Sequence, residues 1–220
     1  ALWEEGYTLQ FIEPRFLGSK TAAYRVIFLP FLMYLPQEHA DQLVEFVAQG
    51  GTVVGFAKLG HLDGRGWAWN DRPGAGLTSL FGARETHIEV FREPHQKLTL
   101  QVERGSPLFE GITSETINGY WHRQEFALEN DVDVLARFVD GAPAIIRRRH
   151  GKGQAILVAT QLDMAFWEYR DPALRQLLGN LVRMCGVEKD VIVTSSTDME
   201  YARRRVDAHL LSHGDQYAIL

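Results

Sequence analysis

The chain has 220 residues, which suits one large domain, or one domain of about 180 residues with a short appendage. Its hydrophobic fraction of 45% is ample for a buried core, and its formal charge of −5 disfavours nucleic acid as a main partner. No run approaches the roughly 18 apolar residues of a membrane span, so we expect no membrane partner. The single cysteine, Cys185, excludes an internal disulfide and suits the cytoplasm, although a cysteine-poor secreted protein would look the same.

Both ends of the sequence resemble cuts in a longer polypeptide. Residues 1–6 are typical of the last turn of a helix that stops at Gly6. Residues 216–220 are typical of a strand that is still apolar where the sequence ends. We therefore expect a domain excised from a larger protein.

The first half of the chain predicts a strand–helix–strand unit. Residues 7–12 form a short strand candidate, and residues 24–30 a near-continuous apolar strand, as in a parallel sheet with both faces buried. Pro36 is expected at the first helical position of a helix that ends at Gly50 and Gly51. Residues 52–57 form the next strand, so the pattern is a right-handed βαβ unit.

A long loop is expected over residues 58–80, which are rich in Gly, Pro, Asp and Asn. Trp67 and Trp69 lie within it, and tryptophan is enriched at binding hot spots. An interface is therefore one interpretation. The other is that both rings pin the loop to its own domain.

The second half predicts strands followed by one long helix. Strands are expected at residues 87–91, 98–102, 132–139, 144–147 and 154–160, the last two joined by a glycine turn at 150–153. Asp171 and Pro172 are typical of a helix start, and Gly186 of its end. Residues 187–220 indicate a small antiparallel β domain, including strands at 191–194 and 206–210 and a turn at 212–215. The fold class is thus an α/β layered sheet followed by the start of a second, β domain.

The turn after residues 52–57 is where such a fold would place a nucleophile. A nucleophile elbow needs small residues around the reactive side chain, because the strand-to-helix turn is sharp. Here Lys58 occupies the central position and Leu59 follows it. No obvious base is near in sequence, so an ordinary solvent-facing lysine is the preferred interpretation and no catalytic residue is assigned.

The other candidate motifs lack the sequence surroundings that their chemistry requires. Cys185 lies on the apolar stripe of the predicted long helix, where cysteines are usually inert. Residues 150–153 lead into a strand rather than a helix, which excludes a phosphate-binding loop. His61 and Asp63 form only a weak metal motif, so no metal and no cofactor are expected. The candidates for interface or sugar contact are Tyr34, His61, Trp67, Trp69, Trp121 and Arg123.

Several modest motifs, in order, resemble the middle domain of glycoside hydrolase family 42 β-galactosidases. They include residues 1–3, 49–52, 77–82, 121–125, 141–145 and 151–155, and the resemblance covers residues 1–186. It implies a trimerisation domain with a flavodoxin-like, class I glutamine amidotransferase-like fold, helices on both faces of the sheet, and a β domain from residue 187. It also implies a homotrimer whose catalytic glutamates lie on a preceding TIM barrel. A galactoside at a shared interface is a further candidate partner.

In the amidotransferase relatives a cysteine stands at the position aligned with Lys58, so the resemblance also implies a site without that chemistry. Two other hypotheses stay open: an amidotransferase-like enzyme with an unusual nucleophile, and a domain that senses sugar near residues 31–34 and 58–61. The basic run from Arg147 to Arg149 departs from the family pattern, and its role is open.

Overall fold

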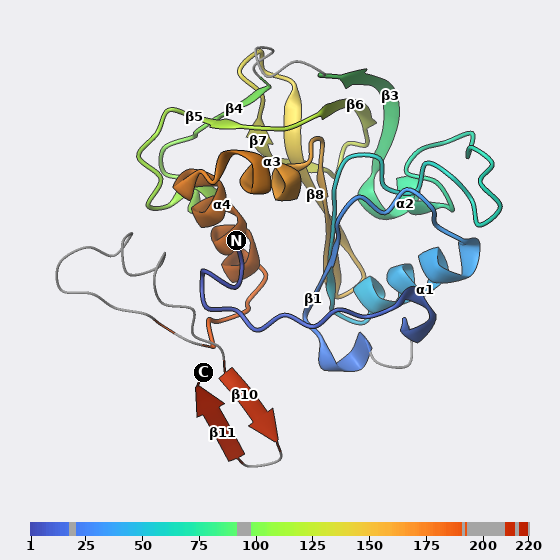
Figure 1. The fold of residues 1–220 in the computed structure, drawn as a ribbon. Coiled ribbons are helices and arrows are strands. Elements are labelled where there is room, and N and C mark those ends of the chain that lie inside the picture. The colour runs from blue at the N-terminus through green and yellow to red at the C-terminus, as the bar shows by residue number, and fades with distance from the viewer. Residues whose placement is uncertain (18–20, 92–97, 191, 193–209, 214–215, 220) are drawn as a thin grey trace.

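The computed structural model describes residues 1–17, 21–91, 98–190, 192, 210–213 and 216–219 of the chain (Figure 1). A mixed α/β architecture is built around one central sheet. None of the helices in these ranges is both long enough and apolar enough to cross a membrane.

The central sheet has the strand order β1-β2-β9-β8-β7. Its members are β1 (Val26–Leu29), β2 (Thr52–Gly55), β9 (Gly153–Val158), β8 (Pro143–His150) and β7 (Asp133–Arg137). Strands β1, β2 and β9 are parallel, whereas β8 and β7 join in antiparallel pairs. The sheet is therefore mixed, with parallel strands at one side only.

The predicted βαβ unit is confirmed. β1 and β2 pair in parallel, and α1 (Gln37–Ala48) connects them. The prediction for Pro36 was wrong by one position, because Pro36 has an extended backbone with ψ 150° and is the N-cap rather than the first helical residue. A helix boundary shifted by one residue is common, since helix ends are gradual.

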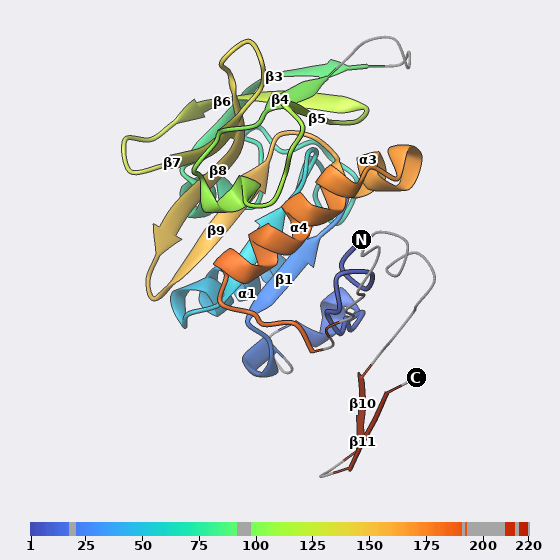
Figure 2. The same cartoon turned by 90° about the vertical axis from the view of Figure 1, so that its left-hand side faces the viewer.

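Helices cover both faces of the sheet. Neighbouring residues of one strand point to opposite sides, so adjacent residues of β2 show what packs on each face. Val53 packs with the core residues of α1 and α2 (Leu77–Phe81). Val54 packs with the buried leucines of α4 (Pro172–Met184) and with α3 (Leu162–Tyr169). Figure 2 shows α4 running along one side of the sheet.

Helix α4 begins as its sequence predicts. The Asp171 carboxylate accepts a hydrogen bond from the Ala173 amide at 2.9 Å, and Pro172 is the first helical residue. The sequence did not reveal α3, whose eight residues bury Leu162, Ala165 and Phe166. A helix this short carries a weak periodic signal.

Shorter sheets and turns complete the fold. β3 (Ala83–Val90) pairs with β6 (His122–Leu128), β4 (Thr99–Gln101) with β5 (Thr116–Asn118), and β10 (Leu210–His213) with β11 (Gln216–Ile219), all antiparallel. Three 3-10 turns span Pro14–Phe16, Thr21–Ala23 and Pro107–Phe109. The strand expected at the end of the sequence is confirmed as β11, whereas the expectation of a separate β domain stays a prediction. The strand predicted at 191–194 and most of that at 206–210 lie outside the described residues.

Two local predictions were wrong. Residues 7–12 form no strand. The Thr8 amide instead donates to the Asp190 carboxylate at 2.7 Å, and the Tyr7 hydroxyl donates to the Gly179 carbonyl at 3.2 Å, so this segment is fastened to α4 and its exit. The turn expected from residue 212 was placed too early, because Ser212 and His213 belong to β10.

The basic run from Arg147 to Arg149 is explained in part by cross-strand pairing. Arg147 contacts Asp133, its register partner on β7, at 2.7 Å. Arg148 contacts Glu129 at 2.7 Å and Asp131 at 3.0 Å. Arg149 is exposed. The glycine turn at 150–153 joins β8 to β9 as an antiparallel hairpin, as predicted.

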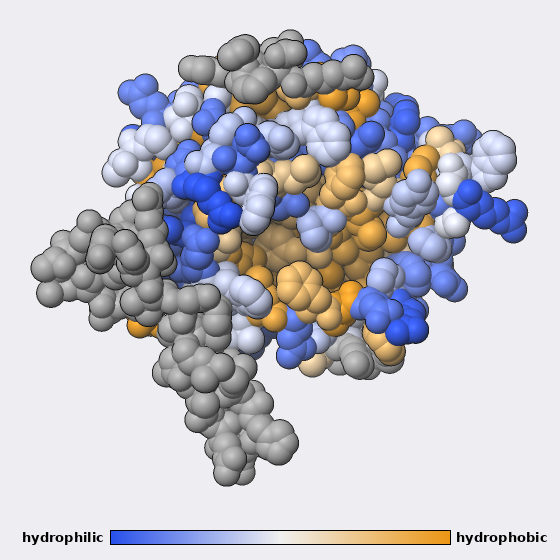
Figure 3. All heavy atoms as spheres, in the orientation of Figure 1, coloured by the Kyte–Doolittle hydropathy of each residue, from blue (hydrophilic) through white to orange (hydrophobic). Residues whose placement is uncertain are grey.

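One face of the sheet near β1 is only partly covered. β1 lies at the edge of the sheet, and its residues Val26 and Phe28 are half-buried while Ile27 and Leu29 are buried on the opposite face. Figure 3 shows apolar side chains gathered over this region, between α1 and α4. The helices thus leave an apolar area beside the first strand.

Candidate functional site

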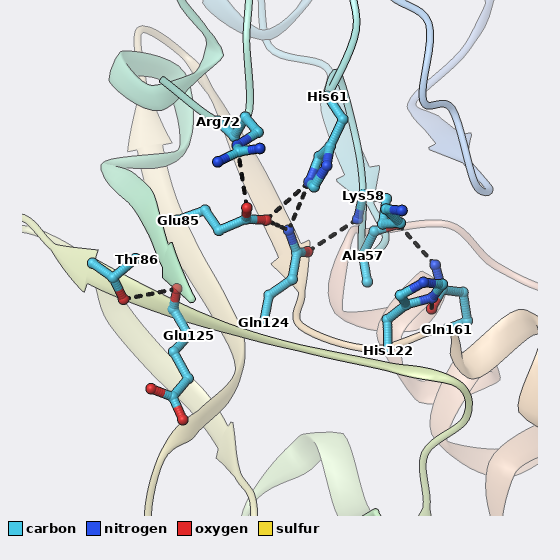
Figure 4. Close-up of polar contacts among 10 residues, drawn as sticks. All are labelled: Ala57, Lys58, His61, Arg72, Glu85, Thr86, His122, Gln124, Glu125 and Gln161. Carbon is cyan, nitrogen blue, oxygen red and sulfur yellow. Dashed lines mark hydrogen bonds and ion pairs between the residues drawn. The ribbon is translucent and has the colours of Figure 1, made fainter. Parts of the chain in front are cut away.

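The candidate site lies at the edge of the sheet where the parallel strands end. Phe31 follows β1, Lys58 follows β2 and Gln161 follows β9. Parallel strands with the order β1-β2-β9 bring these three positions to one edge, where open α/β sheets usually bind ligands. Figure 4 shows the polar side chains that β3 and β6 add to this edge.

Lys58 has the backbone conformation of a tight, left-handed turn, with φ 67°. Its amide donates to Oε1 of Gln124 at 3.1 Å, and its side chain is half-buried. No carboxylate within the described ranges forms an ion pair with its ammonium. The expectation of an ordinary solvent-facing lysine therefore omitted a strained backbone and a partly enclosed side chain.

Two aromatic residues next to this turn share the left-handed conformation. Phe31 has φ 44° and Trp121 has φ 62°. Their rings stack with centroids 5.4 Å apart, and the Phe31 ring lies 6.2 Å from His122. A non-glycine residue in this region costs about 1–2 kcal/mol, because its Cβ approaches the backbone. The edge of the sheet therefore holds three strained residues, of which Phe31 and Trp121 are in ring contact.

A buried carboxylate organises the polar side chains behind Lys58. Glu85 on β3 has a side chain that is 2% exposed, and its oxygens contact Nε2 of His61 at 2.9 Å and Nε of Arg72 at 3.2 Å. The Gln124 amide also donates to Glu85. Burial alone raises the pKa of Glu85, but the hydrogen bonds from His61 and Gln124, with the charges of His61 and Arg72, outweigh burial and lower this pKa below its usual value.

A second chain of hydrogen bonds joins His122 to the turn. Nδ1 of His122 lies 3.0 Å from Oε1 of Gln161, and the Gln161 amide donates to the Ala57 carbonyl at 2.9 Å. Because an amide oxygen only accepts, Nδ1 of His122 carries the proton. Burial lowers the pKa of His122, helped by the nearby charges of Lys58 and His61. The imidazole therefore favours its neutral form.

Both histidines form hydrogen bonds that stabilise the fold. His61 donates to Glu85 and His122 donates to Gln161, and both side chains are buried. A lysine nucleophile needs a neighbouring base or a lowered pKa. The geometry places Glu85 on the far side of His61 and Gln124 from Lys58 (Figure 4). The arrangement therefore presents the Lys58 ammonium on a turn that is held by the hydrogen bond to Gln124.

The predicted contact residues separate into distinct places. Tyr34 and Trp67 are exposed at 58% and 74%, whereas Trp69 is half-buried against the core. Trp121 stacks on Phe31 and packs on the buried His122, with ring centroids 4.4 Å apart. Arg123 lies further along β6, where it contacts Asp140 at 2.6 Å and stacks over Phe138. The structure therefore brings Trp121 and His61 toward Lys58, and holds Arg123 in its own ion pair.

The loop that carries Trp67 is rigidly held. The Asp63 carboxylate accepts hydrogen bonds from the amides of Arg65 and Trp67, both at 2.8 Å. The Asp63 amide donates to the Trp67 carbonyl at 2.8 Å, and Leu62 bridges to both Tyr34 and Ala68. Asp63 is thus occupied by backbone amides, and the described residues contain no cluster of three metal-ligating side chains.

Sequence reasoning missed Glu85 and Gln161, and it named Phe31 and Gln124 only as members of residues 31–34 and 121–125. Strand β6 alternates buried and exposed positions, but the buried ones are His122 and Gln124 rather than apolar residues. Period-two alternation with polar residues on the inner face was the available signal. Its meaning depends on Glu85, which lies far away in sequence.

Comparison with known proteins gives the family. A model described as the β-galactosidase trimerisation domain matches residues 1–188. The cold-adapted β-galactosidase from Rahnella sp. R3 is 20% identical, with a TM-score of 0.78 over 99% of this chain and 30% of that one. A catalytic mutant of Gan42B, a family 42 β-galactosidase from G. stearothermophilus, is 18% identical, with a TM-score of 0.76 over 99% of this chain and 28% of that one.

A third similar structure is the β-galactosidase from Bacillus circulans sp. alkalophilus, at 20% identity and a TM-score of 0.71, over 90% of this chain and 27% of that one. This chain therefore spans less than a third of each of these enzymes. At such identities the structures show a shared fold, whereas the family model covers most of the chain. The chain belongs to the β-galactosidase trimerisation domain family, the middle domain of glycoside hydrolase family 42.

Proposed function

We propose that the chain is the non-catalytic assembly module of a larger β-galactosidase, in which it holds three copies together. The family match over residues 1–188 carries this proposal, together with the chain's share of less than a third of its relatives. The hydrolytic glutamates would then lie on a separate TIM barrel of the same polypeptide.

The fold supports a flavodoxin-like, amidotransferase-like origin for this module. A βαβ unit, parallel central strands and helices on both faces are features of that class. The antiparallel β8 and β7 extend the sheet at one side. We propose domain limits of 1–186 for this module and 187–220 for the start of a β domain.

The turn at Lys58 supports a role without chemistry. The elbow geometry is kept, with φ 67°, but the central side chain is an amine and the adjacent histidines are bonded to Glu85 and Gln161. Such a turn lacks the nucleophile–base hydrogen bond that covalent catalysis uses.

The exposed pair Tyr34 and Trp67 is our proposed self-contact surface. Aromatic side chains dominate interface hot spots, and a rigid loop loses little entropy when it binds. The bonds to Asp63 fix Trp67 before any partner arrives. A galactoside bound at a shared interface could use the same rings.

The non-catalytic claim is tested by assaying the chain itself with a chromogenic galactoside. We expect hydrolysis no faster than in buffer, and the same result for Lys58→Ala. Hydrolysis by the wild-type chain that Lys58→Ala abolishes would overturn the proposal, since it would place chemistry at the turn.

A further inference from the structure

The strained residues at the edge of the sheet form one continuous group. Phe31, Lys58 and Trp121 all have positive φ, the rings of Phe31 and Trp121 stack, and Gln124 on the same strand as His122 accepts from the Lys58 amide. Strained backbones persist where surrounding structure over-determines them, and they cluster at functional contacts. This group is therefore a candidate contact site for a partner.

The charge at this group is unbalanced. Among the side chains of the described ranges, none forms an ion pair or a hydrogen bond with the Lys58 ammonium. The nearest buried carboxylate, Glu85, is already engaged by His61, Arg72 and Gln124. Around Lys58 the remaining ionisable neighbours are imidazoles, and its charge helps to lower the pKa of His122 after burial. A negatively charged group from a partner would therefore balance the Lys58 ammonium.

The aromatic rings near Lys58 favour one kind of anion, a carboxylate carried on an apolar side chain. The half-buried rings of Phe31 and Trp121 both pack on His122, the imidazole whose pKa the charge of Lys58 helps to lower, and they provide apolar contact there. A charged pair that is partly shielded from water gains strength, and flanking rings exclude water from it.

The partner that fits is a second copy of this chain, an inference that rests on the proposed assembly role. A ring of three copies is joined head to tail, so a cationic spot on one copy meets a different, acidic spot on the next. The chain carries 28 acidic against 23 basic residues. Exposed carboxylates without an ion pair in the described part of the chain include Glu103, Glu115 and Glu168.

We propose that Lys58, flanked by Phe31 and Trp121, binds a carboxylate of the adjacent copy, so that the former elbow is a contact point of the trimer.

The test uses the intact polypeptide and measures its trimer dissociation constant by sedimentation velocity at several salt concentrations. Lys58→Glu should weaken association about tenfold or more, and Lys58→Arg should stay close to wild type. Higher salt should reduce the difference. Lys152→Glu, an exposed lysine at the β8–β9 turn, is the matched charge control and should change little.

A second variant separates contact from folding. Asparagine tolerates positive φ, so Lys58→Asn should keep the wild-type Tm while weakening association. A purely structural lysine would instead lower Tm and leave the assembly intact. If Lys58→Glu associates as tightly as Lys152→Glu, the inference is overturned while the assembly role stands. A wild type that stays monomeric removes the assembly role itself.

Discussion

Replacing Glu85 by glutamine removes one negative charge from the buried carboxylate at the site. The carboxylate is 2% exposed and contacts His61 at 2.9 Å and Arg72 at 3.2 Å. Breaking a buried ion pair costs about 3–5 kcal/mol, because the remaining charge is left uncompensated. Arg72 is 39% exposed, so water replaces part of its loss. We therefore expect Glu85→Gln to lower the free energy of unfolding by about 3 kcal/mol.

The assay is urea unfolding near neutral pH, supported by a thermal scan in which we expect Tm to fall by about 6–12 °C. Glu89→Gln is the matched control, since Glu89 is exposed on the same strand and should cost under about 0.5 kcal/mol. Equal stabilities for the two variants would refute the reasoning.

The loss of stability in Glu85→Gln should depend on pH. The folded pKa of Glu85 lies below its ordinary value of 4.5, so its stabilising contribution is complete above that value. That contribution disappears as the pH falls through the folded pKa. The gap between wild type and Glu85→Gln should accordingly narrow in acid, and a gap independent of pH would contradict an ionised Glu85.

Three further outcomes follow from buried groups. Burial raises the pKa of the Cys185 thiol to about 11, so at pH 8 a thiol reagent should label native protein about a hundredfold more slowly than unfolded protein; equal rates would contradict this. A Cβ at Gly153 would meet backbone carbonyl oxygens at 2.1 and 2.4 Å, so Gly153→Ala should cost about 3 kcal/mol of unfolding free energy in urea, against about 1 for Gly141→Ala, which meets open space. The lowered pKa of His122 predicts stability lost as pH falls from 6.5 toward the folded pKa; His122→Asn should remove that loss in pH-dependent melts, and the exposed control His87→Asn should not.

Elements with strong local signals were predictable from the sequence. The βαβ unit, the Asp171 cap and the β8–β9 hairpin each follow from apolar runs, a capping residue or a glycine turn. These signals are local, so they need no knowledge of distant partners. Strand β6 is the opposite case, because its buried positions are polar and make sense only beside Glu85.

The candidate site was predictable only at its centre. Lys58 was found because it follows an apolar strand, and Trp67 because it lies in a glycine-rich loop. The stacking of Phe31 on Trp121 joins residues from opposite halves of the fold. Backbone strain at these positions leaves no trace in residue type, since neither is glycine or asparagine.

Light scattering of the intact polypeptide tests the central claim most directly. We expect the mass of a trimer for the wild type and for Trp167→Ala, a control that removes a ring 73% exposed on α3. Trp67→Ala should shift the mass toward the monomer, because it removes the exposed ring that the Asp63 loop presents. A wild-type protein that stays monomeric at high concentration would contradict the account.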